Sequence, residues 1–258
     1  MPTTELTVDA PCWVDLTSSD PGAVLSFYER LFGWQADSMD GDCRGYVTFS
    51  RDDVAIAGIG RQVPNTSRSN VWNVYIASAD ADATVAEAAE AGAEITVAPS
   101  AVGEQGRMAL VTDPGGAVTG IWQAGKHRGF GTWGERGTPV WHEQFTRDYR
   151  AALPFYETVF GWGYGVLGDT DDFRYAQGVV DGDTVAGIMD AGAILPEGVP
   201  SHWRVYFGVD DTDVAVAKVC ELGGAVIDPA EDSPFGRVAG VADPLGARFQ
   251  IASIDPDR

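Results

Sequence analysis

Apolar and polar positions follow a cycle along the chain that occurs four times: a strand, a helix and then several strands. Residues 12–17 alternate between apolar and polar side chains, which is typical of a half-buried strand. The next segment carries apolar side chains at helical spacing. Asp20 is its expected N-cap, Pro21 its first helical residue and Gly33 its stop.

The same patterns predict the remaining elements. Helices are expected over residues 80–91, 149–160 and 212–222. Strands are expected over residues 45–50, 54–61, 72–77, 94–98, 106–112, 117–123, 139–146, 173–180, 183–189, 203–209, 225–228, 236–242 and 246–252.

Two sequence motifs occur twice. The segment FYERLFGW at residues 27–34 returns as FYETVFGW at residues 155–162, an offset of 128 residues. The segment GRMALVTDP at residues 106–114 returns as GRVAGVADP at residues 236–244, an offset of 130 residues. Two well-separated repeats at nearly one offset indicate a duplicated domain.

The duplication divides the 258 residues into two domains, each long enough to bury its own core. We expect the first domain over residues 8–124 and the second over residues 138–254. Residues 125–137 between them are glycine-rich and irregular, which indicates a linker.

Charge and cysteine content narrow the choice of partners and compartment. The formal net charge of −21 argues against nucleic acids and anionic membranes as partners, because both would repel the protein. Cys12, Cys43 and Cys220 are odd in number and lack paired spacing, so neither a disulfide framework nor a zinc site is expected. No signal peptide and no apolar stretch long enough for a bilayer is visible, and we expect a cytoplasmic protein.

At these motifs the chain resembles the vicinal oxygen chelate superfamily, also called the glyoxalase/bleomycin-resistance/extradiol-dioxygenase group. The resemblance rests on the strands before Asp20 and Asp148, the two FY…FGW helices, and the turns DPGG and DPLG that begin at Asp113 and Asp243. It implies an α+β fold of four βαβββ modules, which form two tandem domains with curved mixed sheets around clefts. The tandem form is similar to actinobacterial members of the group. It also implies a monomer with pseudo-twofold domain pairing, or a homodimer.

Many members of this superfamily chelate a divalent metal through His, Gln or Glu on four inward-facing strand positions. The first position falls on Trp13 and Trp141, whose indoles offer no lone pair. The last position falls on Gly120 and Gln250.

The other two positions are also poor in ligands. One falls near Asn73 and Arg204, or one residue earlier on a tryptophan, and the other lies in residues 54–60 or 184–189, which contain no His, Asp or Glu. We therefore expect neither a bound metal nor another cofactor.

An alternative metal site would use His142, Glu143 and His202. However, His142 and Glu143 are adjacent, so on a strand they face opposite sides of the sheet. Both histidines are expected on the solvent side or in loops.

Strand alternation predicts which side chains line the two clefts. The expected ligand-binding residues are Trp13, Asn73, Trp122, Trp141, Phe145, Arg204 and Gln250. The candidate catalytic residues are Asp15 and Glu143 as general bases and Tyr75 and Tyr206 as hydrogen-bond donors. The alternative is that both tryptophans fill the space of a metal and give solid cores. An inward carboxylate is costly without a partner, so its presence in both copies favours a hydrated or liganded cleft.

The preferred hypothesis is a metal-independent protein that binds a small organic molecule, such as an antibiotic or metabolite, in its aromatic clefts. A second hypothesis is an isomerase, lyase or hydroxylase-type enzyme with an inward acid as base. The third is glyoxalase-like aldehyde detoxification, which the resemblance implies. The second copy carries the richer polar set and is the favoured site.

Overall fold

The computed structural model describes residues 6–38, 45–62 and 69–254. These residues form two eight-stranded mixed sheets, one from each copy of the repeat. The strand orders are β2-β3-β4-β1-β5-β8-β7-β6 and β10-β11-β12-β9-β13-β16-β15-β14.

The elements of the first copy are β1 (Pro11–Ser18), α1 (Pro21–Phe32), β2 (Gln35–Ser38), β3 (Val47–Arg51), β4 (Val54–Arg61), β5 (Val71–Ala77), α2 (Ala81–Glu90), β6 (Glu94–Val102), β7 (Gly106–Thr112) and β8 (Val118–Ala124). Those of the second copy are β9 (Pro139–Thr146), α3 (Tyr149–Phe160), β10 (Gly163–Asp169), β11 (Arg174–Val180), β12 (Asp183–Asp190), β13 (His202–Val209), α4 (Thr212–Glu221), β14 (Ala225–Ser233), β15 (Gly236–Ala242) and β16 (Arg248–Ser253).

Each sheet consists of two βαβββ modules that join along their first strands. β1 pairs antiparallel with β5, and each of these strands also pairs with the last strand of its own module, in parallel. β9 and β13 join the second sheet in the same way. The expected α+β fold of four modules in two tandem domains is therefore present.

Several details differ from the sequence-based expectation. β6 and β14 extend beyond the predicted residues 94–98 and 225–228, to Val102 and Ser233. Strands β2 and β10 were not predicted, because β2 is a four-residue polar strand and β10 contains three glycines and an acidic end. Asp20 occupies the N-cap position of α1, but its side chain accepts no capping hydrogen bond, whereas Asp80, Asp148 and Asp211 accept theirs. Pro21 at the helix start and the left-handed Gly33 at its end still define α1.

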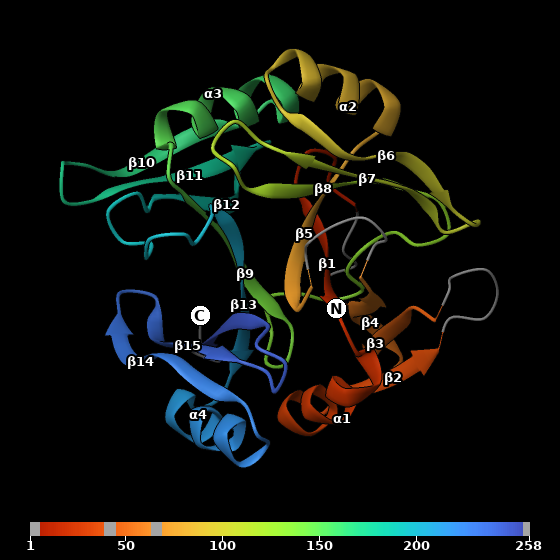
Figure 1. Cartoon of the computed structure of the whole chain (residues 1–258), viewed down its shortest axis with the longest axis vertical. Coiled ribbons are helices and arrows are strands. Elements are labelled where there is room, and N and C mark those ends of the chain that lie inside the picture. The colour runs from red at the N-terminus through yellow and green to blue at the C-terminus, as the bar shows by residue number, and fades with distance from the viewer. Residues whose placement is uncertain (1–5, 39–44, 63–68, 255–258) are drawn as a thin grey trace.

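The two domains pack through helix pairs that each combine both copies of the repeat. α1 lies beside α4, and α2 lies beside α3 (Figure 1). Their buried side chains belong to one hydrophobic core that extends through both domains. The rings of Phe32 on α1 and Phe207 on β13, for example, are 5.1 Å apart. Each sheet therefore has one face against the other domain and one face that points away from it.

Residues 125–137 contain no helix and no strand of either sheet, and they contact both domains, for example through the backbone hydrogen bond that Gly137 donates to Gly208 of the second domain. Phe130 and Gly131 donate backbone hydrogen bonds to Cys12 and Ala55. Gly137 accepts a hydrogen bond from the indole of Trp34 at 2.6 Å. The exact domain boundaries stay a prediction.

The two cysteines in the described part of the chain are both free thiols. Cys12 is a buried free thiol and Cys220 an exposed one, while Cys43 lies outside the described residues. None of the described helices has the length and apolar character that a membrane crossing requires.

Candidate functional site: a carboxylate between two tyrosines in each cleft

An acid flanked by two tyrosines lies on the face of the second sheet that points away from the first domain. Tyr206 on β13 donates a hydrogen bond to Oε2 of the buried Glu143 on β9 at 2.5 Å. Tyr175 on β11 also hydrogen-bonds to Glu143, and its hydroxyl accepts from the indole of Trp141 at 3.2 Å. We call Trp141, Tyr175, Glu143 and Tyr206 the second acid–tyrosine cluster.

Burial governs the protonation of this cluster. It raises the pKa of Glu143, and the hydrogen bonds from the two tyrosines and the charge of Arg204 offset part of that rise. Burial also raises the pKa of Tyr175 and Tyr206 above the ordinary value of 10. Both phenols therefore keep their protons and act as donors toward the carboxylate.

Arg204 places a positive charge beside this cluster. Its guanidinium lies 3.6 Å from the ring centre of Phe145 and 3.8 Å from a carboxylate oxygen of Asp228 on β14. His202 stacks on Phe145 with ring centres 6.2 Å apart. Aromatic, cationic and acidic groups therefore converge on one side of this sheet.

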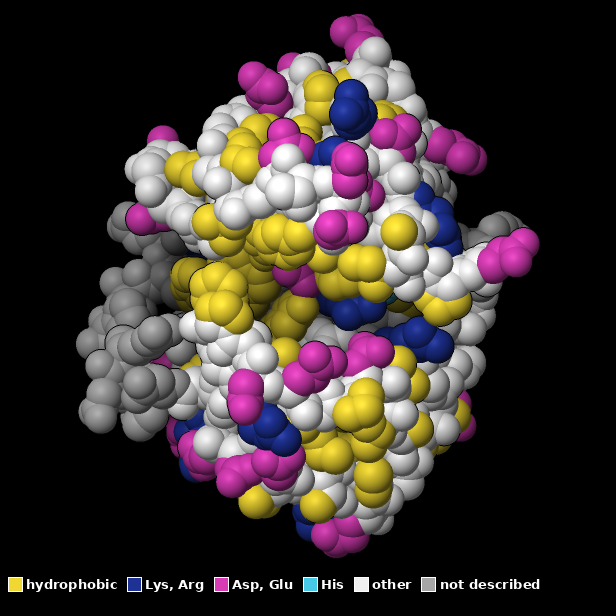
Figure 2. All heavy atoms as spheres, turned by 90° about the vertical axis from the view of Figure 1, so that its left-hand side faces the viewer, with side chains coloured by type: hydrophobic (Ala, Val, Ile, Leu, Met, Phe, Trp, Pro, Cys, Tyr) yellow, Lys and Arg dark blue, Asp and Glu magenta, His cyan; other side chains and the backbone are white. Residues whose placement is uncertain are grey.

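The surface on this side of the molecule is hollowed. Figure 2 shows a depression lined with hydrophobic side chains, with acidic and basic side chains at its centre. The elements that carry exposed hydrophobic side chains here are the β10–β11 hairpin, the β12–β13 loop and the β14–β15 turn. These side chains are Val166, Leu167, Phe173, Ile194 and Phe235. A concave apolar surface with a few convergent polar groups is typical of a small-molecule site.

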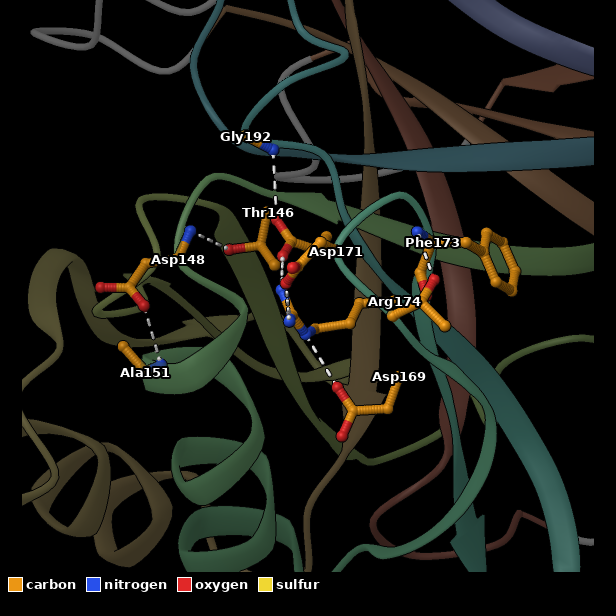
Figure 3. A network of polar contacts seen from close by, with 10 residues as sticks. Thr146, Asp148, Ala151, Asp169, Asp171, Phe173, Arg174 and Gly192 are labelled. Atoms are coloured by element: carbon orange, nitrogen blue, oxygen red, sulfur yellow. Dashed lines mark hydrogen bonds and ion pairs between the residues drawn. The ribbon is translucent and has the colours of Figure 1, made fainter.

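Two arginines hold the segments around this hollow. Arg174 forms ion pairs with Asp169 and Asp171 in the β10–β11 hairpin and with Asp190 at the end of β12 (Figure 3). Arg147 donates hydrogen bonds to four carbonyl groups of the β12–β13 loop. The acceptors are Gly192, Leu195, Pro196 and Val199.

The first domain contains the same arrangement, which we call the first acid–tyrosine cluster. Tyr75 donates to Asp15 at 3.0 Å, and the hydroxyl of Tyr46 lies 3.4 Å from the same carboxylate oxygen. Trp13 donates its indole N–H to Tyr46 at 2.9 Å. Asn73 donates to the other oxygen of Asp15 at 2.8 Å, where the second cluster has Arg204 in its vicinity.

The linker packs onto the first cluster. The ring of His127 lies between Trp13 and Trp122, with ring centres 4.3 Å and 5.5 Å away. Trp122 donates its indole N–H to the carbonyl of His127, and Phe130 packs on Trp13. As a result Trp13 is only 4% exposed, whereas its counterpart Trp141 is half-buried. Trp13 therefore has the packing role that the solid-core alternative describes.

The positions expected to carry metal ligands are covered by tyrosine rings. A Cβ added to Gly58 would lie 1.8 Å from the hydroxyl of Tyr46, and one added to Gly187 would lie 2.0 Å from the hydroxyl of Tyr175. An added Cβ would overlap the tyrosine hydroxyl at both positions. Positions 58 and 187 therefore accept only glycine while Tyr46 and Tyr175 keep these conformations.

The remaining positions also lack a ligand set. The ring of Tyr75 covers Gly120, and Gln250 lies beside Tyr206 on the neighbouring strand. Throughout the described ranges, no three His, Cys, Asp or Glu side chains converge as a metal ion would require. The residues present therefore do not fit a chelated divalent metal.

The structure resolves the register that the sequence left open. Asn73 and Arg204 lie beside Asp15 and Glu143 on the cleft faces. Trp72 and Trp203, one residue earlier, point into the core between the domains. Asn73 and Arg204 therefore share a sheet face with Asp15 and Glu143, and the role of these residues as a ligand site stays a proposal.

The expectation for His142 was wrong. It faces the domain interface at 2% exposure and stacks on Phe130, because β9 is covered on that side by the linker. His202 is half-buried on the cleft side.

Sequence reasoning missed Tyr46 and Tyr175, which complete the two clusters. A signal was present: each tyrosine and the glycine that it covers recur at an offset of 129 residues, as Tyr46 and Tyr175 and as Gly58 and Gly187. This offset lies between those of the two longer repeats. The signal is weak because the match is a single residue at the tyrosine and three residues at the glycine, Ala57-Gly58-Ile59 and Ala186-Gly187-Ile188.

The protein has two tandem domains. Each domain is an eight-stranded curved sheet of two βαβββ modules with polar residues on its outward face. This architecture defines a paired glyoxalase-like protein. The chain belongs to the Glyoxalase/Bleomycin resistance protein/Dioxygenase superfamily, whose sequence model matches residues 12–120 and 139–251.

Relatives over nearly the full length come from actinobacteria. The chain is 36% identical over 253 residues to CFP32 of Mycobacterium tuberculosis, whose name assigns it to the glyoxylases, and the match covers 96% of both chains. It is also 36% identical to the anthracycline biosynthesis protein DnrV of Streptomyces peucetius, over 95% of this chain and 93% of DnrV.

Solved structures show the same fold. The Mn(II)-bound glyoxalase from Novosphingobium aromaticivorans superimposes with a TM-score of 0.64 at 17% identity, over 97% of this chain and 85% of that one. The 2,3-dioxygenase LapB from Pseudomonas sp. KL28 gives a TM-score of 0.64 at 15% identity, over 99% and 96% of the two chains.

Proposed function

We propose that the protein binds a small aromatic molecule in the cleft of its second domain and does so without a chelated metal. The observation that carries this proposal is the second acid–tyrosine cluster, in which Trp141, Tyr175, Glu143 and Tyr206 occupy the region where a metal-binding relative would hold its ion. This cluster offers a buried carboxylate and aromatic surfaces instead of metal ligands.

The difference between the clefts supports the second domain as the site. His127 of the linker occupies the space between the two tryptophans of the first cleft. The second cleft combines Glu143 with Arg204 and Gln250 and opens into the hollow of Figure 2. The name of DnrV connects that relative with anthracyclines, and we extend to this chain the corresponding ligand class, a flat hydroxylated aromatic compound.

A second candidate function, proton transfer, is favoured by the raised pKa of Glu143. A carboxylate of raised pKa is a better base, and Glu143 would accept a proton from a carbon next to a carbonyl group of the ligand. Tyr206 or Arg204 would then stabilise the negative charge that develops on the carbonyl oxygen. Return of this proton from Glu143 to a different carbon of the ligand would give an isomer and regenerate the carboxylate, as in an isomerase. Glyoxalase-like aldehyde chemistry stays the third candidate, supported by the name of CFP32 alone.

The proposal is tested by thermal unfolding with 1,2-dihydroxyanthraquinone as the probe. We expect the probe to raise the Tm of the wild type, because a ligand that binds only the folded state stabilises it. Glu143→Gln should reduce that shift, and the matched variant Asp15→Asn in the first cleft should keep it. Equal shifts in all three proteins would refute a site at Glu143.

Two further measurements separate the alternatives. Elemental analysis of protein purified without chelators should find no stoichiometric transition metal, and one metal ion per chain would overturn the metal-free mechanism. Mass spectrometry of the compound recovered after incubation distinguishes binding from catalysis, since an enzyme returns a changed product or, in D2O, a deuterated one.

A further inference from the structure

A cavity lies between the two domains, on the opposite side of β9 from the second cleft. Its volume is about 370 Å³. The first residues of β1, the linker and the start of β12 form its walls, so both domains and the linker contribute to it. The volume is within the range of roughly 300–1,000 Å³ that is usual for small-molecule sites.

His142 lines this cavity, and one of its ring nitrogens has no hydrogen-bond partner among the described residues. Its side chain is 2% exposed and stacks on Phe130 with ring centres 5.7 Å apart and an interplanar angle of 20°. Among the described residues, nothing forms a hydrogen bond with its Nε2 atom, and burial lowers the pKa of the imidazole to about 3. A buried imidazole nitrogen without a hydrogen-bond partner is rare and requires an explanation.

The fold itself does not require a histidine at this position. In the first repeat the equivalent residue, 128 positions earlier, is Val14, which is completely buried. A valine is cheaper to bury than an imidazole, because an imidazole loses its hydrogen bonds to water. The histidine is therefore better explained by a molecule that enters the cavity than by packing.

The other walls define the chemistry of such a molecule. Phe130 is part of one wall, and Trp133 lines the cavity with 44% of its surface exposed. Arg128 and Asp183 also line it and carry opposite charges, so the cavity has no strong preference for an ion. Flat aromatic surfaces with one neutral hydrogen-bonding ring favour an uncharged aromatic ligand.

We propose that this interdomain cavity is a second binding site, separate from the clefts, for an uncharged aromatic molecule of one or two rings with a hydroxyl group. The rings lie against Phe130 and Trp133, and the hydroxyl group forms its hydrogen bond with the imidazole of His142. The proposal does not depend on the function of the clefts.

The test uses 1-naphthol as the probe and the indole N–H signal of Trp133 as the readout in a 1H–15N spectrum. The chain has eight tryptophans, and the signal absent from the spectrum of Trp133→Phe identifies Trp133. We expect 1-naphthol to shift this signal saturably. His142→Phe keeps an aromatic ring against Phe130 but removes the ring nitrogens, and it should weaken 1-naphthol binding about tenfold, the effect of one hydrogen bond.

Three controls make the outcome decisive. Thr184→Trp changes an exposed residue of the cavity wall and should abolish the shift even if His142→Phe folds poorly. Naphthalene, which lacks the hydroxyl group, should bind His142→Phe and wild type equally. Glu143→Gln changes the opposite face of β9 and should leave the shift of Trp133 unchanged. Absence of a saturable shift, or equal shifts in wild type, His142→Phe and Thr184→Trp, would overturn the proposal.

Discussion

The most direct test of the architecture is Tyr156→Phe, which removes one hydroxyl group between the domains. Tyr156 on α3 is completely buried and donates to Asp113 of the first domain at 2.9 Å. Its hydroxyl accepts from Gln144 at 2.7 Å and contacts the hydroxyl of Thr119 at 2.7 Å. Thr119 in turn accepts from the indole of Trp203 at 2.9 Å, so it is available as a donor to Tyr156.

The counterpart Tyr28 provides a matched control. It donates to Asp243 of the second domain at 3.0 Å and accepts from Trp72 at 3.3 Å. Gln144 and Thr119, which bond to Tyr156, have no polar counterpart at Tyr28. The equivalent residues in the other copy are the apolar Leu16 and Phe249. The two phenylalanine variants therefore remove the same atom from networks of different size.

The magnitude follows from the bonds lost. A buried hydrogen bond between neutral groups contributes about 1 kcal/mol net and one to a charged group about 1.5–3 kcal/mol. Tyr156→Phe loses one bond to a carboxylate and two neutral bonds, or about 4 kcal/mol. Tyr28→Phe loses one bond to a carboxylate and one neutral bond. Because the neutral bond is long, we expect a loss of about 2–3 kcal/mol in the free energy of unfolding. With roughly 2–4 °C per kcal/mol for a chain of this size, Tyr156→Phe should lower the Tm by about 12 °C.

Urea unfolding followed by tryptophan fluorescence and by circular dichroism measures both variants. Because one core extends through both domains, we expect the two probes to report a single transition. The double variant Tyr156→Phe/Asp113→Asn should cost less than the sum of the single variants, because the residues share one bond. If Tyr156→Phe costs less than about 1 kcal/mol, or no more than Tyr28→Phe, the hydrogen-bond network does not stabilise the domain interface.

Three further predictions concern the second cleft. Burial raises the pKa of Glu143 in the folded state above its ordinary value of 4.5, so its stabilising effect is complete at lower pH and is lost as pH rises through the raised pKa. The Tm of Glu143→Gln relative to wild type should therefore increase from pH 4 to pH 8, and a constant difference would contradict the burial argument. Gly187→Ala should displace Tyr175 and destabilise the protein by about 1–3 kcal/mol, as measured by urea unfolding. Gly163→Ala is its control, since the nearest atom to the added Cβ is 3.8 Å away, and equal costs would count against the contact. Arg147→Ala removes the donors that hold the β12–β13 loop and should accelerate its cleavage by proteinase K, because this protease does not require a basic or aromatic residue, neither of which the loop contains. The Tm should change by less than about 3 °C, and unchanged cleavage would show that other contacts hold the loop.

The fold was predictable because it depends on local periodicity and on a repeat that covers most of the chain. Strands and helices with clear apolar spacing, such as β1 and α3, lie within a few residues of their expected positions. The polar edge strand β2 has no such spacing, so its pairing with β3 depends on tertiary structure. The absence of a cap bond from Asp20 likewise depends on a side-chain conformation that the sequence does not determine.

The candidate site was predictable only in part, since strand parity gives the direction of a side chain but not its partners. Parity placed Asp15 and Glu143 in the clefts, and the structure adds partners that the sequence argument lacked. The carboxylates accept hydrogen bonds mainly from tyrosines, and these come from other strands of the sheet. A buried acid with such donors does not by itself require a ligand. The hollow on this side of the second sheet and the raised pKa of Glu143, rather than a missing partner, support the proposal of a site there.

The duplication separates the residues that hold the fold from those that give each domain its chemistry. The two longest repeats meet across the domain interface, where each tyrosine of an FY helix donates to the aspartate of a DP turn in the other domain. At the candidate sites several equivalent positions differ, as Asn73 differs from Arg204 and Val14 from His142. The fold tolerates either member of each pair, so these differences are free to adapt one domain to a ligand. We therefore expect substitutions at the repeated tyrosines to change stability first, and substitutions at Arg204 or His142 to change binding first.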